Sequence, residues 1–352
     1  MSSMNIICCS DCFVSEGLRL DAIRLGKCFD TPCPVCGNEG GYGLSKDGLL
    51  GLAHSYFSHG SRYIFEYGSA SLLNVGSFKE AEINSGTRID KDISLIHELT
   101  GEYIFYASPR YWMFGENDFL KRMKHKRRRN KAFREVFENY PGRLIRKQDK
   151  FYRIRIDPSD PDEESQYDSP PEKFLGSGRF DSKNEPVMYA SPDLDLCIHE
   201  SRAKPYDNIF VATLSPARDL KMLDLSFLVY DPDSTEFESM DIAVHMMMLS
   251  SSSYDVCRDL ASYAREYGYD GIVHSSYFSH IKTGTKPFQT IFGLSYRILP
   301  QMHNYEKYSS VPNYVIFGRP IRNELVGIKS IDKVIISRIR YDYHFGPSYQ
   351  VL

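Results

Sequence analysis

The sequence predicts an α+β protein in which a small zinc-binding module and a mainly helical segment precede one domain built on a mixed β-sheet. Two observations carry this prediction. Six of the eight cysteines fall within the first 36 residues, and strand-like and helix-like patterns interleave from about residue 150 to residue 352. Interleaved elements that each bury one face are typical of a sheet covered by helices. We therefore expect three regions, at residues 1–45, 46–148 and 149–352.

Composition excludes several classes of protein. The chain has 352 residues, of which 42% are apolar and 25% are charged, and this is the ordinary range for globular proteins. A wholly disordered, collagenous or coiled-coil chain is thereby excluded. No run of 18 apolar residues occurs, so no membrane span is predicted. The first residues also lack the charged start and apolar stretch of a signal peptide, and a cytoplasmic location is the resulting expectation.

The first cysteines have the spacing of a metal site. Cys9 and Cys12 form one C-x-x-C pair, and Cys33 and Cys36 form a second pair after 20 intervening residues. Two such pairs offer four thiolates that can converge on a structural Zn²⁺, with no open position for catalysis. The alternatives are a redox pair, which needs only one C-x-x-C unit, and a reduced N-terminus without metal. Cys8 is a substitute for Cys9 that the spacing also allows.

The segment from residue 46 to residue 148 is predicted to be mainly helical. Helix-like runs occur at 49–56 and 93–100, and an aromatic run lies at 103–106. A basic helix follows, and the Pro-Gly pair at 141–142 marks the end of the segment.

Charge is unevenly distributed, although the net charge of the whole chain is only −3. Residues 101–150 carry 14 Lys and Arg against 6 Asp and Glu, whereas residues 151–250 carry 9 against 20. Apolar residues punctuate the basic run Lys121–Arg134 at loosely helical spacing. Two interpretations stay open: a solvated face or docking surface for the acidic half of the chain, and a phosphate-binding patch for nucleic acid.

The second half of the chain alternates between strand and helix patterns. An alternating apolar and basic strand opens it at 151–156, and an acidic loop rich in Pro and Ser follows at 157–172. Further strands are predicted at 187–190, 208–214, 271–273 and 289–293, and helices after 191–193 and at 240–249 and 254–267. This order indicates an α/β or α+β domain.

Common catalytic motifs are missing from the sequence. It contains no G-x-x-x-x-G-K-[ST], G-x-G-x-x-G, H-E-x-x-H or G-x-S-x-G pattern, so P-loop, Rossmann, zincin and α/β-hydrolase chemistry lose support. Cys197 and His199 do not form a catalytic pair, because positions two apart on a helix point about 200° away from each other.

A set of chemically suitable positions remains in the second half of the chain. A glycine-flexed turn presents an arginine beside an aromatic residue, and a predicted strand ends in serines. Taken singly, each position also fits a surface, core, helix-face or turn role. Their order along the chain is Arg153, the turn 176–180 with Arg179, Tyr189, Glu200, Ser275 and Ser276.

That order resembles the RES domain family, which is named for Arg, Glu and Ser. Residues 176–181 fit the family's G-x-G-R-[WF]-[ND] turn, and residues 186–191, followed by Glu200, fit its P-V-[LM]-Y block. Residues 270–276 fit its D-G-I-x-x-x-S block, in which Ser276 matches the family's serine better than Ser275. The acidic insertion at 157–172 and the first 145 residues have no counterpart in the minimal domain.

The resemblance implies a fold similar to ADP-ribosyltransferases and an enzyme that degrades NAD⁺. Such domains look like toxins that cleave the nicotinamide–ribose bond with water or phosphate, many of them paired with a DNA-binding antitoxin. It thus implies an NAD⁺ glycohydrolase or phosphorylase, acting as a toxin or anti-phage defence effector, with an antitoxin or regulatory partner. Two alternatives stay open: an ADP-ribosyltransferase acting on protein or nucleic acid, and a zinc-ribbon nucleic-acid-binding protein with an inactive RES-like domain. A homo-oligomer is also left open.

The residues that match the family have suitable chemistry for this reaction. Guanidinium groups hold pyrophosphate or phosphate oxygens bidentately, and a tyrosine offers an aromatic face to a ring. A carboxylate can stabilise an oxocarbenium-like state or orient a ribose hydroxyl and the attacking water, and a serine can hydrogen-bond to ribose or phosphate. The catalytic candidates are Glu200, Arg179 and Tyr189, and the candidates for binding NAD⁺ are Arg153, Ser276 and Ser275.

Overall fold

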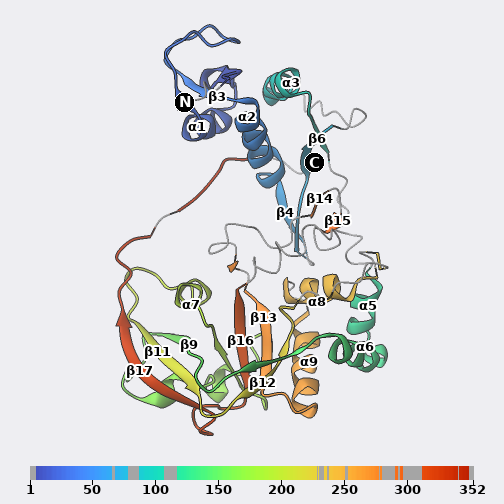
Figure 1. The fold of residues 1–352 in the computed structure, drawn as a ribbon, viewed down its shortest axis with the longest axis vertical. Coiled ribbons are helices and arrows are strands. Elements are labelled where there is room, and N and C mark those ends of the chain that lie inside the picture. The colour runs from blue at the N-terminus through green and yellow to red at the C-terminus, as the bar shows by residue number, and fades with distance from the viewer. Residues whose placement is uncertain are drawn as a thin grey trace. The chain divides into compact units, whose positions relative to one another are not determined.

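The computed structural model divides the chain into two compact units (Figure 1). Unit 1 comprises Met1–Trp112 and Arg340–Leu352, and unit 2 comprises Met113–Ile339. Unit 2 is therefore inserted, in sequence, between two parts of unit 1. The structure describes residues 5–65, 68–77, 87–106, 117–227, 229, 234–235, 238–249, 253–276, 278–279, 290–291, 294–295, 311–339 and 341–348. Among the helices of these residues, none combines the length and apolar character that a membrane span requires.

Unit 1 begins with the cysteine-bearing elements. The antiparallel sheet β1-β3-β2 has its longest strand in the middle, and its strands are β1 (Cys8–Cys9), β2 (Lys27–Cys28) and β3 (Tyr42–Leu44). The short 3₁₀ turn η1 (Ser10–Cys12) and helix α1 (Glu16–Leu25) connect β1 to β2. Both C-x-x-C pairs therefore lie beside one small sheet.

Unit 1 continues with helices and two-stranded ladders. Its helical elements are α2 (Lys46–Ala53), the π-helical turn η2 (His54–His59) and α3 (Ile89–Thr100). Its ladders are antiparallel and pair β4 (Arg62–Phe65) with β5 (Gly68–Ser71) and β6 (Leu73–Gly76) with β7 (Tyr103–Tyr106).

One apolar core joins these elements to the end of the chain. Leu18 of α1, Leu49 of α2 and Ile96 of α3 are fully buried in it, and Phe345 packs against it. The backbone amide of Phe345 donates to the carboxylate of Asp21 at 2.8 Å. Because residues on both sides of position 45 share this core, the expected cysteine module and the helices after it belong to one unit.

Unit 2 is built on two sheets. The five-stranded sheet has the order β10-β16-β13-β12-β8, in which only β12 and β13 run parallel. Its strands are β8 (Gly142–Ile145), β10 (Val187–Ala190), β12 (Leu220–Asp224), β13 (Gly271–Ser275) and β16 (Pro312–Phe317). The antiparallel three-stranded sheet β17-β11-β9 consists of β9 (Phe151–Ile156), β11 (Ile209–Pro216) and β17 (Val326–Val334). A short ladder pairs β14 (Thr290–Ile291) with β15 (Leu294–Ser295).

Both sheets contribute to one apolar core. Phe151 and Leu214 from the three-stranded sheet pack with Met188, Met222 and Ile316 from the five-stranded sheet. A bridge between Tyr152 and Ser191 joins the sheets at one side, with amide-to-carbonyl distances of 2.7 and 3.0 Å. The expected α+β architecture with a mixed sheet is confirmed.

Helices flank the sheets of unit 2 (Figure 1). α9 packs against β13, and α7 packs against β9. The α-helices of the described part of unit 2 are α5 (Asp118–Lys124), α6 (Lys126–Asn139), α7 (Leu194–Glu200), α8 (Met240–Leu249) and α9 (Tyr254–Glu266). The acidic loop expected at 157–172 contains the 3₁₀ turn η3 (Glu164–Tyr167), and a second 3₁₀ turn, η4 (Glu172–Phe174), begins at its last residue. Its Tyr167 is fully buried, which anchors the loop in the core.

The boundaries between the two units lie after residues 112 and 339, whereas the sequence predicted boundaries after residues 45 and 148. Strand β8 forms the edge of the five-stranded sheet by pairing with β12, so the last part of the expected segment 46–148, from residue 113 onward, belongs to unit 2. Arg129 of α6 is buried, and its guanidinium binds the carboxylates of Asp255 and Asp259 on α9. The residues after 339 return to unit 1.

Candidate functional site

A cavity of about 650 Å³ in unit 2 is lined by every site residue that was expected in the second half of the chain. Its wall comes from β9, β10, β13 and β16, together with α7, α8 and the first residue of α9. The six expected residues on this wall are Arg153, Arg179, Tyr189, Glu200, Ser275 and Ser276. Strands that are distant in sequence thus present these side chains to one space.

The carboxylate of Glu200 is held through one of its two oxygens. Ser276 Oγ and Asn313 Nδ2 both donate to Glu200 Oε1, each at 2.7 Å. The amide of Phe278 donates to Ser276 Oγ at 3.1 Å, and this fixes the hydroxyl so that it points its proton at the carboxylate. None of the described residues donates to Oε2, which leaves that oxygen available to a ligand in the cavity.

Asn313 is a site residue that sequence reasoning missed. It lies on β16 and pairs in register with His274 of β13, and His274 lies two positions before Ser276. A single asparagine in an apolar strand forms no sequence motif that would mark it as a site residue. Only the pairing of the two strands shows that it reaches the carboxylate of Glu200.

The turn that carries Arg179 is shaped by Tyr189 and Asp181. The amide of Phe180 donates to Tyr189 Oη at 3.0 Å, and Tyr189 Oη lies 3.4 Å from Asp181 Oδ1. The other carboxylate oxygen accepts from the Gly176 amide at 2.6 Å. Burial raises the pKa of Tyr189, so its hydroxyl stays protonated. Tyr189 therefore positions the turn with its hydroxyl and presents its ring to the cavity.

Arg179 projects from this turn toward the first residue of α9. Its guanidinium carbon lies 4.7 Å from the centre of the Tyr254 ring, and Nη1 donates to the carbonyl of Met247 at 3.2 Å. Arg258 supports the turn from behind, because it donates to the carbonyls of Gly176 and Gly178 at 2.7 and 2.9 Å. Tyr254 also lines the cavity and was not among the expected site residues.

Arg153 is buried, and both of its terminal nitrogens donate to backbone carbonyls. Its guanidinium donates to the carbonyls of Tyr189 and Asp168, the latter at 2.9 Å. Burial, followed by repulsion from Arg155, lowers the pKa of Arg153. Its Nε is buried and has no hydrogen-bond partner within the described residues. Arg153 thus forms a fixed part of the cavity wall, and its Nε–H has no acceptor among the described residues.

His274 brings a neutral imidazole to the cavity. Burial lowers its pKa to about 4, so it carries no charge at neutral pH. Its Nδ1 lies 3.0 Å from the carbonyl of Ser275, and its ring lies 5.6 Å from the ring of Phe180. The residue stands inside the sequence block that ends at Ser276, but nothing in that pattern distinguishes it from a packing residue.

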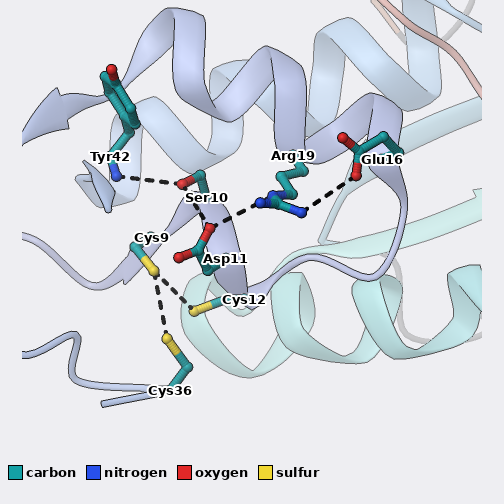
Figure 2. A network of polar contacts seen from close by, with 8 residues as sticks. All are labelled: Cys9, Ser10, Asp11, Cys12, Glu16, Arg19, Cys36 and Tyr42. Atoms are coloured by element: carbon teal, nitrogen blue, oxygen red, sulfur yellow. Dashed lines mark hydrogen bonds and ion pairs between the residues drawn. The ribbon is translucent and has the colours of Figure 1, made fainter. Parts of the chain in front are cut away.

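The expected cysteine quartet of unit 1 is assembled. The Sγ atoms of Cys9, Cys12, Cys33 and Cys36 all lie within 4.8 Å of one another. Cys9 Sγ is 3.8 Å from Cys12 Sγ and 3.5 Å from Cys36 Sγ (Figure 2), and Cys12 Sγ is 3.6 Å from Cys33 Sγ. Four thiolates about 2.3 Å from a tetrahedral Zn²⁺ stand about 3.8 Å apart. The donor set and its spacing therefore fit a zinc ion.

The loop with the first cysteine pair is tied to its surroundings by polar contacts (Figure 2). Ser10 Oγ accepts from the amide of Tyr42 and donates to Asp11, both at 3.4 Å. Asp11 lies 3.6 Å from the guanidinium of Arg19, which also contacts Glu16. These contacts connect the cysteine loop to β3 and α1.

Comparison with known protein families finds a match in the part of the chain that carries the cavity. Residues 150–284 match the family model of the RES domain. This match agrees with the resemblance in the sequence, and the cysteine cluster is consistent with a zinc-ribbon-like region before it in the chain.

Among solved structures, the chain is similar to the crystal structure of the M. tuberculosis MbcT–MbcA toxin–antitoxin complex. The sequence identity is 11%, the match covers 58% of this chain and 91% of that chain, and the TM-score is 0.34. No curated protein matches the chain.

The Gly178→Ala variant tests how tightly the Arg179 turn is built. A Cβ at position 178 would lie 1.9 Å from Asp181 Oδ1 and 2.9 Å from Tyr189 Oη, so the turn must shift. We expect a loss of about 2 kcal/mol in the free energy of unfolding, in the range usual for overpacking, as measured by urea denaturation.

Gly51→Ala is the matched control for this variant. A Cβ at position 51 of α2 meets no atom within 4 Å, and alanine is favoured over glycine in a helix by up to about 1 kcal/mol. A Gly178→Ala protein as stable as the wild type would show that the turn is looser than its contacts indicate.

Proposed function

We propose that unit 2 is an enzyme that cleaves the nicotinamide–ribose bond of NAD⁺, as a glycohydrolase or a phosphorylase. The observation that carries the proposal is the Glu200 carboxylate, which is fixed by Ser276 and Asn313 inside an arginine-lined cavity. The arginines on the cavity wall are Arg153, Arg155, Arg179 and Arg202. The association of RES domains with NAD⁺ cleavage supports the same conclusion.

The chemistry of NAD⁺ suits this arrangement. Its pyrophosphate is anionic and fits a wall of guanidinium groups, while its nicotinamide carries a positive charge. When the glycosidic C–N bond breaks, the electron pair stays on the nicotinamide nitrogen, which leaves as a neutral ring and needs no proton. The positive charge passes to the ribose, where the free Oε2 of Glu200 stabilises the oxocarbenium-like state.

The nucleophile completes the reaction in one of two ways. Water that attacks the ribose carbon gives ADP-ribose and releases one proton, whereas inorganic phosphate gives ADP-ribose-1″-phosphate. Glu200 Oε2 can accept a hydrogen bond from the attacking water or from a ribose hydroxyl. His274 is neutral and adds a polar group to the cavity without adding to the positive charge of its arginines.

The Glu200→Gln variant tests the role of the carboxylate. An amide has no negative charge to offer the developing cation, so we expect the rate of NAD⁺ consumption to fall at least about a hundredfold. The melting temperature should stay close to that of the wild type, because the amide oxygen still accepts from Ser276. The measurement is incubation of the purified protein with NAD⁺, with and without phosphate, followed by chromatography of the products.

Glu266→Gln is the matched control, since Glu266 is an exposed carboxylate on α9 outside the cavity. Free ADP-ribose identifies a hydrolase, ADP-ribose-1″-phosphate a phosphorylase, and a labelled macromolecule a transferase. Equal NAD⁺ loss by Glu200→Gln and the wild type would rule out the proposed role of Glu200.

We further propose that this activity makes the protein a toxin or a defence effector that depletes cellular NAD⁺. An antitoxin or regulatory partner would then restrain it. The RES domain supports this reading at the level of the family.

The cysteine quartet is proposed to bind one structural Zn²⁺. Four protein thiolates fill a tetrahedral site and leave no position for substrate, so the metal would stabilise unit 1.

We expect about one zinc per chain by elemental analysis, and loss of that zinc together with a lower melting temperature in Cys36→Ser. Cys28→Ser is the control, since Cys28 is exposed and outside the quartet. Equal zinc content in Cys36→Ser and the wild type would contradict the site.

A second proposed function is nucleic-acid binding by the exposed face of α6. Arg127, Lys131 and Arg134 are exposed at i, i+4 and i+7, a spacing that places them on one helix face. None of the three has an ion-pair partner within the part of the chain that the structure describes. Arg129, by contrast, is buried against α9, so only part of the basic run is available to a phosphate backbone.

Salt dependence of DNA binding tests this second function. Replacing Arg127, Lys131 and Arg134 by alanine removes up to three phosphate contacts. We expect the slope of log K against log salt to become shallower by roughly 2–3 units, measured by fluorescence anisotropy on duplex DNA between about 50 and 200 mM salt. A triple alanine variant at the exposed Lys147, Arg322 and Lys329 is the charge-matched control. An equal change of slope in both variants would show that α6 is no specific surface.

A further inference from the structure

Arg202 adopts a backbone conformation that arginine rarely takes. Its φ is 53°, which lies in the left-handed region, and it follows Ser201, the residue that caps the C-terminus of α7. Glycine is the usual residue at such a position after a helix, because a Cβ is disfavoured there. Of the non-glycine residues in the described part of the chain, only Asp157 and Glu324 share a positive φ. An arginine at this position therefore carries a conformational cost.

The Arg202 side chain does not offset this cost by capping the C-terminus of α7. The last carbonyls of α7 already have donors: Cys197 accepts from the Ser201 amide at 3.0 Å, and His199 accepts from the Arg202 amide at 3.0 Å. The carbonyl of Ile198 accepts from Ser201 Oγ at 2.9 Å. The guanidinium of Arg202 is not needed by these groups, although basic side chains at helix ends often serve them.

The Arg202 side chain is instead exposed on the cavity wall, two residues beyond Glu200. The other arginines of the wall each donate to a backbone carbonyl: Arg153 and Arg155 to that of Asp168, and Arg179 to that of Met247. No hydrogen bond or ion pair involves the Arg202 guanidinium among the described residues. Its five donors are therefore free for a ligand.

The charge of the cavity indicates what that ligand carries. Its described lining includes four arginines and a single carboxylate, that of Glu200. An excess of positive charge around one carboxylate suits a ligand with several negative oxygens and one cationic centre. In NAD⁺ the pyrophosphate is esterified to the same ribose whose C–N bond breaks, so a cation two residues from Glu200 lies within reach of it.

We propose that Arg202 binds the pyrophosphate of the dinucleotide and so selects substrates that carry a phosphate. This assignment rests on the proposed NAD⁺ cleavage. A guanidinium can grip two phosphate oxygens at once, whereas an ammonium acts as a point charge. The left-handed backbone aims this side chain into the cavity at the expense of local stability, as is common at functional sites.

The test compares phosphate-bearing and phosphate-free ligands in Arg202 variants. We expect Arg202→Ala to weaken ADP-ribose binding, measured by calorimetry, and to raise the KM for NAD⁺, each about tenfold. Arg202→Lys should lie between Arg202→Ala and the wild type. With nicotinamide riboside, which has no phosphate, kcat/KM should be equal in the wild type and Arg202→Ala. Arg322→Ala, at an exposed arginine outside the cavity, is the matched control.

Arg202→Gly separates binding from structure. Glycine accepts the left-handed conformation without a clash, so its melting temperature should be at or above that of Arg202→Ala while ADP-ribose binding is weakened as strongly. A residue with a merely structural role would not combine retained stability with lost affinity.

The outcomes distinguish the two levels of the proposal. ADP-ribose binding that is unchanged in Arg202→Ala, or an equal loss with nicotinamide riboside, overturns the assignment of Arg202. Binding that depends on Arg202 in a wild-type protein that does not consume NAD⁺ upholds the phosphate site and overturns the proposed reaction. A wild type that binds no ADP-ribose overturns both.

Discussion

The hydrogen bonds from Ser276 and Asn313 to one oxygen of Glu200 are the interaction on which the cavity depends. They exist because β13 and β16 pair in a single register, which aligns His274 with Asn313. A slip of one residue would turn the Asn313 side chain to the opposite face of the sheet. The carboxylate would then lose a donor and its fixed orientation. A charge that is oriented before substrate binds needs little reorganisation in the transition state.

A second network places Arg179 without using that register. Gly178 allows the turn to approach Tyr189 and Asp181 closely, and Arg258 of α9 binds the turn carbonyls. The carboxylate and the arginine are thus held by different elements, one by strand ends and the other by a helix. Both come to the same cavity because α9 packs against β13. Disturbing one network need not disturb the other directly.

Several residues of the cavity have conformations or surroundings that lower the stability of a folded protein. Arg153 is buried with a depressed pKa and one donor without a partner in the described residues, and Arg202 has a left-handed backbone. Such costs are tolerated where the fold around them is over-determined. Here the two sheets share one core, and the buried Tyr167 anchors the long acidic loop to it. The well-packed core around the cavity therefore compensates for these destabilising features.

Features that depend on residues close together in the chain could be predicted from the sequence. The spacing of Cys9, Cys12, Cys33 and Cys36 predicted a quartet that the fold assembles, and the order of Arg179, Tyr189 and Glu200 predicted residues that share one cavity. Motifs of this kind are legible because each is a short local pattern. Tertiary structure decided the rest, including the donor Asn313, the neutral His274, the free Arg202 and the assignment of residues 113–148 to unit 2. These depend on which strands pair, in which register, and on which groups are left without partners, and such long-range choices leave no local pattern in the chain.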